Sequence, residues 1–346
     1  MIPDVDFNIE RNSCHSDVRG NPKVSVGIPV YNGGTSLERA LNSILNQNYP
    51  NLEVVISDNC STDNTQEIVH EYLARDRRVK YVRQDVNLGA TENFTKVFRL
   101  TTGEYFMWAA ADDFRSPEFV SSCLAHMQSD QSAVLCAPKI NGLISSLPQV
   151  RWTTSLSSFS DKTTVLTRYK ETLKNFPATA IYGLYKSSAV KNTAVFEKFM
   201  GSDLVFIQNL SIEGNFIECK STLFTYSGRE NWNTTDQDYR NIFGKARKPW
   251  YYVPFFVVLF HQLVGIRNSK VALSIQFSLM RILLFHQIGQ FVLKVTLKLV
   301  KYCLPGNLKV RIGENLYWRF IHSPNVEAER NFQYREKIIR PIIGQR

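Results

Sequence analysis

Short apolar runs alternate with amphipathic stretches through the first part of this chain, and this alternation restricts the possible folds more than any other feature. The apolar runs lie at 23–32, 52–58, 79–84 and 103–110, and between them apolar residues recur at helical spacing. Strands that alternate with helices on this scale build βαβ units, in which helices cover both faces of the sheet. We therefore predict an α/β fold with a mixed, mostly parallel sheet flanked by helices.

Acidic and turn-forming residues follow the expected strands directly. The first strand ends in the turn sequence PVYN, the second ends at Asp58, and the fourth is followed by the adjacent pair Asp112 and Asp113. Ligands of open α/β sheets bind at the carboxyl ends of the strands, so these residues are expected to share one site. Adjacent carboxylates repel each other when buried, so the pair indicates either a solvated turn or a cation site.

Two alternatives stay open at these positions. Asp58 can accept hydrogen bonds from a nucleotide base or ribose, or it can cap the loop sequence NCST that follows it. The Asp pair suits Mg²⁺ or Mn²⁺, which one or two carboxylates hold together with phosphate oxygens. The sequence has no G-x-G-x-x-G and no G-x-x-x-x-G-K-[ST], which disfavours a dinucleotide-dependent dehydrogenase and a P-loop nucleotidase.

Residues 23–120 carry a resemblance to a known family. The segments VSVGIPVYNGGTSLERALNSILNQNYPNLEVVISDNCSTDNT, VRQDVNLGA and GEYFMWAAADDFRSPEF occur in this order. Together they resemble the inverting nucleotide-sugar glycosyltransferases of family 2, which have a GT-A, Rossmann-type fold. The resemblance implies that the nucleotide sugar is bound by Pro29, Val30, Tyr31, Asn32, Asp58 and Asp112. It also implies a metal ligand at Asp113 or Asp112, with the register between the two left open; many relatives have a further Asp where this chain has Ala110.

The second half of the chain contains the other implied site residues. The segment GSDLVFIQNLSIEG is similar to the family's acidic motif, which makes Asp203 the implied catalytic base. The alternative is that Asp203 only caps its helix together with Ser202. Relatives often have an Arg/His stretch near the diphosphate; here TYSGRENW keeps Arg229, implied as a phosphate contact, but lacks the histidine.

The basic residues are concentrated toward the C-terminus. The net charge is +10, yet residues 245–346 hold 17 Lys and Arg against 4 Asp and Glu, and residues 1–244 hold 24 against 27. Apolar runs at 250–266 and 282–304 accompany this charge, the second with a polar stripe of Gln287, Gln290, Lys294, Lys298 and Lys301. This pattern is typical of a helix at a membrane interface. The alternative is a core or partner-facing helix, and a spanning helix is disfavoured.

These features divide the chain into four parts. We expect a flexible lead-in at 1–22, a nucleotide-sugar-binding half at 23–120, an acceptor-binding half at 121–248, and a basic, apolar, helical region at 249–346 that associates with an anionic membrane surface. The six cysteines show no paired motif, and the acidic N-terminus does not resemble a signal peptide. A cytoplasmic protein, peripheral on the inner face of the cell membrane, fits these observations.

The favoured function is inverting transfer of a sugar from a nucleotide-diphosphate sugar, with UDP as the expected nucleotide and Mn²⁺ or Mg²⁺ as cofactor. The acceptor is expected to be a glycan or lipid-linked glycan in surface polysaccharide synthesis. One alternative is a non-catalytic partner subunit with the same fold, favoured by Ala110 and the missing histidine. Another is a nucleotidyltransferase, although no Gly-rich, basic phosphate loop follows the first strand. Nucleic-acid binding is not expected, because the basic region is also apolar.

Overall fold

The first half of the chain forms a parallel sheet. The computed structural model describes residues 21–144, 147–154, 164–175, 178–199, 201–228 and 254–303. Strands pair in parallel in the order β3-β2-β1-β4. These strands are β1 (Val24–Val30), β2 (Leu52–Asp58), β3 (Val79–Arg83) and β4 (Tyr105–Trp108). The predicted βαβ organisation is confirmed.

The second half of the chain extends the sheet with mixed strand directions. From β4 the order continues β8-β6-β9-β5, and β7 pairs with β6. These strands are β5 (Phe114–Arg115), β6 (Ala133–Ile144), β7 (Leu147–Thr154), β8 (Leu184–Lys186) and β9 (Asn215–Gly228). Because β8 is antiparallel to both β4 and β6, and β9 is parallel to β6, strand β9 points the same way as β1 and β4. The mixed sheet confirms the predicted fold class.

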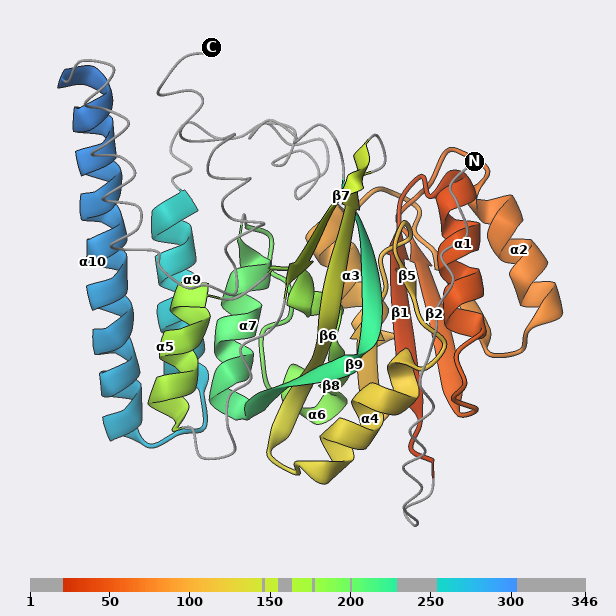
Figure 1. Ribbon diagram of the computed structural model, residues 1–346, viewed down its shortest axis with the longest axis horizontal. Helices are drawn as coiled ribbons and strands as arrows, with labels where there is room; N and C mark the ends of the chain where they lie inside the picture. Colours follow the sequence, from red (N-terminus) through yellow and green to blue (C-terminus); the bar gives the residue numbers. More distant parts are fainter. Residues whose placement is uncertain are drawn as a thin grey trace.

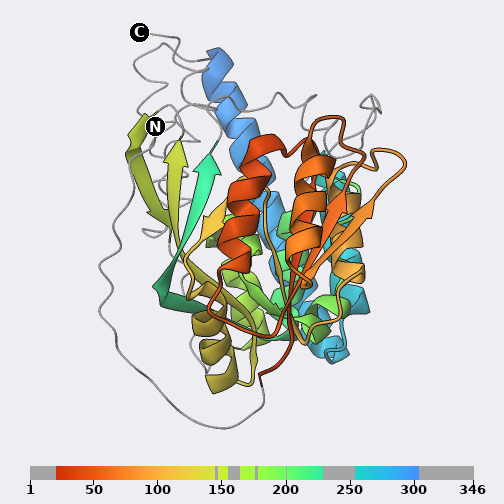
Figure 2. The ribbon, with the colours of Figure 1, turned by 90° about the vertical axis from the view of Figure 1, so that its right-hand side faces the viewer.

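Helices cover both faces of the sheet (Figure 1). One face packs against α1 (Gly34–Leu45), α2 (Thr65–Arg75) and α4 (Phe119–Ser129). The other packs against α3 (Ala90–Arg99), α6 (Ser187–Lys191), α7 (Ser202–Glu213) and the 3₁₀ helix η1 (Ala178–Tyr182). Figure 2 shows α1 and α2 nearest the viewer, with α10 on the far side of the molecule.

The strand sequences explain the two cores. Side chains alternate between the two faces of a strand, so a strand covered on both faces is apolar throughout. Val26 and Ile28 of β1 contribute to the core under α1, α2 and α4, whereas Phe106 and Trp108 of β4 contribute to the opposite core. All four side chains are fully buried.

A third layer of helices lies beyond α7. It consists of α5 (Val165–Asn175), α9 (Pro254–Asn268) and α10 (Leu273–Cys303), which lie side by side on the α7 side of the sheet (Figure 1). Tyr169, Ile266, Leu279 and Leu283 form its core with Ile212 of α7. No helix in the described ranges has the length and apolar character that a membrane span requires.

Parts of the sequence predictions fall outside the described residues. These include the lead-in up to residue 20, residues 229–253 and residues 304–346. Side chains from residue 289 to the end of α10 are also undescribed, so of the predicted polar stripe only Gln287 is placed. Gln287 is partly buried and donates a hydrogen bond from Nε2 to Oε1 of Gln262 on α9, at 2.9 Å. It therefore faces the helix layer.

The amino-terminal end of β2 holds a buried carboxylate. Glu53 is 2% exposed and accepts hydrogen bonds from Lys80 Nζ (2.6 Å), Ser25 Oγ (2.5 Å), Lys23 Nζ (3.1 Å) and the Thr102 backbone N–H (2.9 Å). Burial alone would raise the pKa of Glu53, but these hydrogen bonds outweigh it and lower the pKa to about 2. The ionised carboxylate thus holds β1, β2, β3 and the residues before β4 together.

We predict that Glu53→Gln lowers the free energy of unfolding by roughly 2–3 kcal/mol at pH 7, because a depressed native-state pKa stabilises the folded state. This contribution is fully present above the ordinary pKa of 4.5 and is lost as the pH falls toward 2. Urea unfolding of both proteins from pH 7 to pH 3 measures the difference, which should shrink below pH 4.5. The control is Glu71→Gln, which removes an exposed pair with Arg75 and should cost within about 0.5 kcal/mol. A loss that is equal at every pH would contradict the assignment.

Candidate active site

The topology brings the predicted acidic residues to one edge of the sheet. Strands β1, β2 and β4 are parallel, so Asp58 and the turn after Trp108 lie at their shared carboxyl edge. Helix α7 leads through Gly214 directly into β9, which points the same way as β1, so α7 runs back and begins at that edge. Asp203 is the second residue of α7. The structure therefore brings Asp58, Asp112, Asp113 and Asp203 to the same edge.

Asp58 is fully buried, and protein groups use both of its oxygens. Ser61 donates its backbone N–H to Oδ1 at 2.8 Å, and Tyr81 donates its hydroxyl to Oδ2 at 2.7 Å. Arg83 Nε lies 3.6 Å from Oδ2. Burial, and then the neighbouring Asp58, raise the pKa of Tyr81, so its hydroxyl remains a donor. The capping role is thus present, and nucleotide contact would use the remaining lone pairs of the carboxylate.

The PVYN segment divides into a buried and an exposed half. Pro29 and Val30 belong to β1 and are buried, so they can offer only backbone atoms to a ligand. Tyr31 is 51% exposed, which leaves its ring open to solvent at the sheet edge. Asn32 accepts a hydrogen bond from the Thr62 N–H at 2.8 Å and donates its own N–H to Ser61 Oγ at 2.9 Å.

Backbone strain is found at this same edge. Among the described residues, the non-glycine residues with positive φ are Asn32 at 51° and Cys60 at 65°. The left-handed region is unfavourable for a cysteine and recurs at functional sites, where the surrounding structure enforces it. Both residues lie in loops that leave β1 and β2. The sequence did not indicate the strained backbone of Cys60, because that strain depends on how the loops after β1 and β2 pack together.

A buried amide of α3 fixes the ends of β1 and β2. Asn93 donates from Nδ2 to the carbonyl oxygens of Ser57 (2.9 Å) and Val30 (3.3 Å), and it accepts from Ser57 Oγ at 2.7 Å. Gln84 then donates to Ser57 Oγ at 3.0 Å. A fully bonded buried network specifies one geometry, since a misplaced member would leave a buried polar group unpaired. The sequence analysis missed Asn93.

The turn after β4 places the two adjacent carboxylates in different environments. Asp112 is partly exposed, and its backbone carbonyl accepts a hydrogen bond from Arg39 Nη2 at 2.9 Å. Asp113 is 1% exposed, and its backbone N–H is 3.5 Å from the carbonyl oxygen of Ala110. The pair is therefore not a solvated turn, because one of its members is buried.

A buried guanidinium two residues later offsets the charge of Asp113. Arg115 is 3% exposed and lies between the rings of Phe119 and Phe224, at 5.2 and 4.6 Å from their centroids. Its Nη2 donates to the carbonyl oxygen of Trp108 at 2.8 Å. Burial lowers the pKa of Arg115 to about 10, and the charge of Asp113 counteracts this, so Arg115 is cationic at neutral pH. Sequence reasoning missed Arg115, whose burial depends on Phe224, far along the chain.

The Asp pair fits a divalent cation that needs few protein ligands. In the described part of the chain, no group of three or more His, Cys, Asp or Glu side chains could hold a metal ion. Mg²⁺ commonly takes one or two carboxylates and completes its coordination with phosphate oxygens and water. Asp112 and Asp113 can provide those carboxylates where a diphosphate would approach the strand ends.

Asp203 lies in the first turn of α7. Gly201, with φ of 89°, is the N-cap, and Ser202 is already inside the helix, so the predicted capping role of Ser202 is wrong. Burial raises the pKa of Asp203, although backbone N–H groups of Leu204 and of Asp203 itself act in the other direction. The pKa values of Glu53, Asp76 and Asp130 are lowered, whereas that of Asp203 is raised. A raised pKa suits a carboxylate that must accept a proton.

An aromatic cluster joins the two acidic elements. The ring of Trp108, which ends β4, lies 5.4 Å from that of Phe206 on α7 and 5.0 Å from that of Phe196. Trp108 is fully buried and donates from Nε1 to the carbonyl oxygen of Phe94 on α3 at 3.0 Å. The turn that holds Asp113 and the helix that holds Asp203 thus pack on the same cluster.

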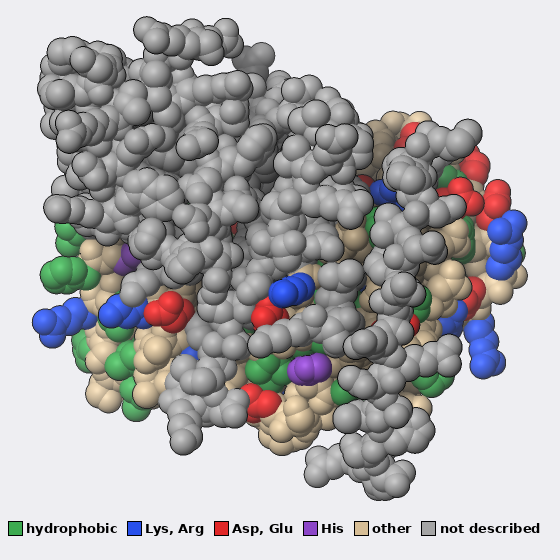
Figure 3. Space-filling view, in the orientation of Figure 1, with side chains coloured by type: hydrophobic (Ala, Val, Ile, Leu, Met, Phe, Trp, Pro, Cys, Tyr) green, Lys and Arg blue, Asp and Glu red, His purple; other side chains and the backbone are tan. Residues whose placement is uncertain are grey.

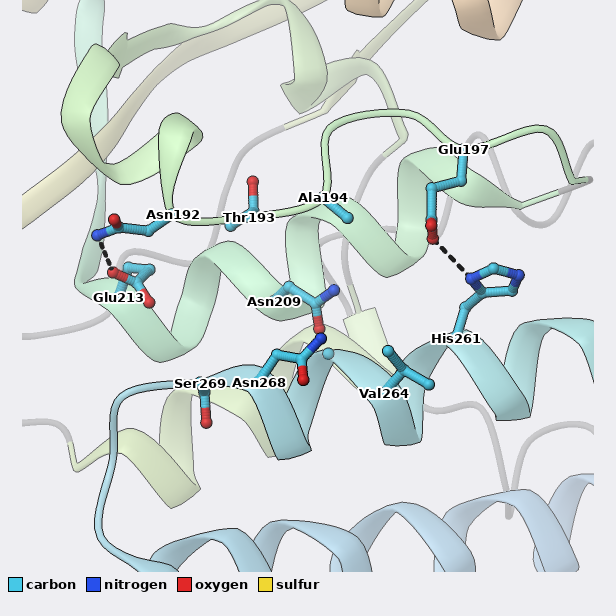
Figure 4. A pocket seen from close by; sticks show the side chains of 11 residues that line it. Asn192, Thr193, Ala194, Glu197, Asn209, Glu213, His261, Val264, Asn268 and Ser269 are labelled. Carbon is cyan, nitrogen blue, oxygen red and sulfur yellow. Dashed lines mark hydrogen bonds and ion pairs between the residues drawn. The ribbon is translucent and has the colours of Figure 1, made fainter.

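A cavity of about 120 Å³ lies elsewhere, between α7, α9 and the residues after α6 (Figure 4). Nδ1 of His261 lies 2.6 Å from Oε2 of Glu197 on its wall, and Asn192 donates to Glu213 at 2.8 Å. None of the predicted site residues lines it. Arg229, the predicted phosphate contact, lies outside the described residues.

Comparisons with known proteins agree with this geometry. Residues 25–192 match the family described as Glycosyl transferase family 2. Over 198 residues the chain is 25% identical to the GalNAc(5)-diNAcBac-PP-undecaprenol beta-1,3-glucosyltransferase of Campylobacter jejuni, covering 56% of this chain and 62% of that protein. Over 122 residues it is 35% identical to the abequosyltransferase RfbV of Salmonella typhimurium, covering 34% and 37%. The aligned stretches thus span less than two thirds of these relatives.

A solved structure shares the fold over most of the chain. Staphylococcus aureus TarS 1-349, in complex with UDP-GlcNAc, superimposes with a TM-score of 0.58 at 20% identity, covering 86% of this chain and 80% of that one. The mixed sheet of this chain and its flanking helices therefore share the fold of that protein. Residues 25–192, just under half of the chain, are thus similar to the family 2 glycosyltransferases.

We predict that Trp108→Ala destabilises the protein by about 3–5 kcal/mol, because it leaves a large cavity where β4, α3 and α7 meet. Trp108→Phe should cost much less, since it retains most of the ring contacts. Urea unfolding measures both, with Leu73→Ala, at a 36% exposed position on α2, as the surface control. Equal free energies of unfolding for the Ala and Phe variants would mean that the ring contacts of Trp108 do not stabilise the fold.

Proposed function

We propose that this protein is an inverting glycosyltransferase that moves a sugar from a nucleotide-diphosphate sugar to an acceptor hydroxyl. The observation that carries the proposal is the meeting of Asp58, the Asp112–Asp113 turn and Asp203 at one sheet edge. Donor binding needs groups that orient the nucleotide and groups that neutralise its diphosphate, and transfer needs a base. The edge offers a candidate for each.

The donor would lie across the ends of β1, β2 and β4. The exposed ring of Tyr31, the backbone at Pro29 and Val30, and the carboxylate of Asp58 would orient the nucleotide, with Asn32 holding the loop in place. Asp112 and Asp113 would hold Mn²⁺ or Mg²⁺, which when bound supplies positive charge to the departing diphosphate. The cation of Arg115 would offset the negative charge of Asp113 in its buried position.

Asp203 would act as the base. Its carboxylate would take the proton of the acceptor hydroxyl while the acceptor oxygen bonds to the anomeric carbon and the bond to the diphosphate breaks. Attack from the face opposite the leaving group inverts the anomeric configuration. A partly buried carboxylate with a raised pKa supports this role, because water competes less for its lone pairs.

The relatives support a more specific substrate class. The Campylobacter jejuni relative is named for an undecaprenol diphosphate glycan, and the Staphylococcus aureus neighbour is described with UDP-GlcNAc. From these names we infer that this protein uses a UDP-sugar donor and a lipid-linked glycan acceptor in surface polysaccharide synthesis. The basic C-terminal third of the chain supports work at the cytoplasmic face of a membrane, as a peripheral protein.

We predict that UDP with Mn²⁺ raises the melting temperature of the protein more than UDP alone, because a ligand that binds only the folded state stabilises it by mass action. Asp113→Asn should abolish the increment that depends on Mn²⁺. Thermal shift with UDP, GDP and dTDP, each with and without Mn²⁺, tests this and ranks the nucleotides. Asp130→Asn, at the remote amino end of β6, is the matched control. No shift with any nucleotide would refute the donor site.

We predict that Asp203→Asn lowers the rate of UDP release at least 100-fold, consistent with the roughly 10²–10⁴-fold contribution of a general base, and leaves the thermal shift with UDP and Mn²⁺ unchanged. The assay uses a UDP-sugar with a polyprenyl-diphosphate-linked sugar as acceptor. In the native protein the rate should fall as the pH drops through the raised pKa of Asp203, because the protonated carboxyl cannot act as a base. A native protein that binds UDP but shows no turnover with any UDP-sugar would favour the non-catalytic partner subunit.

A further inference from the structure

Helix α10 presents an apolar face to solvent. Its five outward-facing large side chains, hereafter the α10 stripe, are 44% to 78% exposed: Leu273, Phe277, Leu284, Phe285 and Ile288. From Phe277 the others recur at four residues before and at seven, eight and eleven residues after, which places them on one side of a helix. Single exposed apolar residues are common, but a contiguous stripe that includes two phenylalanines marks an interaction surface.

The opposite side of α10 already has its partners. Leu279 and Leu283 are fully buried and pack with Tyr169 of α5 and Ile266 of α9. The polar residue Gln287 also turns to this side and bonds to Gln262. Packing against α5 and α9 therefore accounts for the inner side of the helix, whereas the side chains of the α10 stripe are exposed.

Charge indicates what covers the α10 stripe. Residues 254–303 contain six Lys and Arg and no Asp or Glu. Arg267, Lys270 and Arg281 are exposed, and Arg281 follows Phe277 by one helical turn. Hydrophobic and basic side chains meet at the left edge of the molecule in Figure 3, the side on which α10 lies in Figure 1. A second copy would bring like charges together, whereas an anionic lipid surface takes the apolar side chains and pairs with the basic ones.

We propose that the α10 stripe docks this protein on an anionic lipid surface, together with Arg281 and with Arg267 and Lys270 at the junction of α9 and α10. The proposal rests on the proposed function in one respect: a lipid-linked acceptor would give the docked enzyme its substrate. The helix layer connects this surface to the site through buried amides. Gln262 donates to Gln208 of α7 at 2.6 Å, and Gln287 donates to Gln262 at 2.9 Å. Docking through α10 would thus bring the helix that carries Asp203 close to the membrane.

Flotation of the full-length protein with vesicles tests the proposal. Vesicles of equal parts phosphatidylglycerol and phosphatidylcholine are compared with phosphatidylcholine alone, in 0.1 M and 0.5 M NaCl. We expect binding to the anionic vesicles that weakens in high salt, because salt screens the charge pairing. The double variant Phe277→Ser/Phe285→Ser should weaken partitioning about tenfold or more, since each phenylalanine loses its transfer into the apolar phase. Arg281→Gln should reduce the preference for anionic vesicles.

The control variant is Val86→Ser, which removes another well-exposed apolar side chain, in the loop after β3, and should float like the native protein. Thermal shift with UDP and Mn²⁺ is measured on every variant, so loss of docking is separated from loss of folding or of the donor site. A native protein that responds to UDP but does not float would overturn the docking proposal and leave the proposed function intact. A dimer in analytical ultracentrifugation that the double variant dissociates, without vesicle binding, would assign the stripe to a second copy instead.

Discussion

The packing of Trp108 is the constraint on which the rest of the site depends. Its ring fills the space where β4, α3, β8 and α7 meet, within 4.6 to 5.4 Å of the rings of Phe106, Phe196, Tyr185 and Phe206. The chain leaves this buried anchor and turns at once into Asp112 and Asp113, while α7 starts just before Phe206. Because an aromatic core of this density resists small shifts, two acidic elements that are distant in sequence keep a fixed relation.

The buried carboxylates of the edge differ in what compensates their charge. Asp58 accepts hydrogen bonds on both oxygens, and Asp113 lies beside the cation of Arg115, so each has a donor or an opposite charge within the protein. At Asp203, the backbone N–H groups of its own first turn do not outweigh burial. The same residue type is therefore suited to three tasks: holding a loop, meeting a cation, and accepting a proton. The environment, not the residue, distinguishes them.

The sequence predicted what depends on local pattern and missed what depends on distant contacts. Strand alternation and helical spacing are local, so β1 to β4 and α7 appear where they were expected. Nothing in the local sequence distinguishes Arg115 from an ordinary surface residue, because the ring that packs on it, Phe224, belongs to the distant strand β9. The role of Asn93 likewise depends on the packing of α3 against β1 and β2. The roles of the Asp residues came from family resemblance, which pattern alone could not supply.

Helix α7 is the element that relates the chemistry to the outer helix layer. One side packs Phe206 into the Trp108 cluster, and the other bonds Gln208 to Gln262 of α9. The two helices are also in close contact at Gly265 of α9, where an added Cβ atom would lie 2.2 to 2.5 Å from side-chain atoms of Asn209 on α7. Buried amides and a glycine contact leave α9 little freedom to slide on α7, since either movement would unpair a polar group or create a clash. The position of Asp203 relative to the α10 stripe is therefore a property of the fold. A surface that binds α10 would also set the distance from which an acceptor must reach the proposed base.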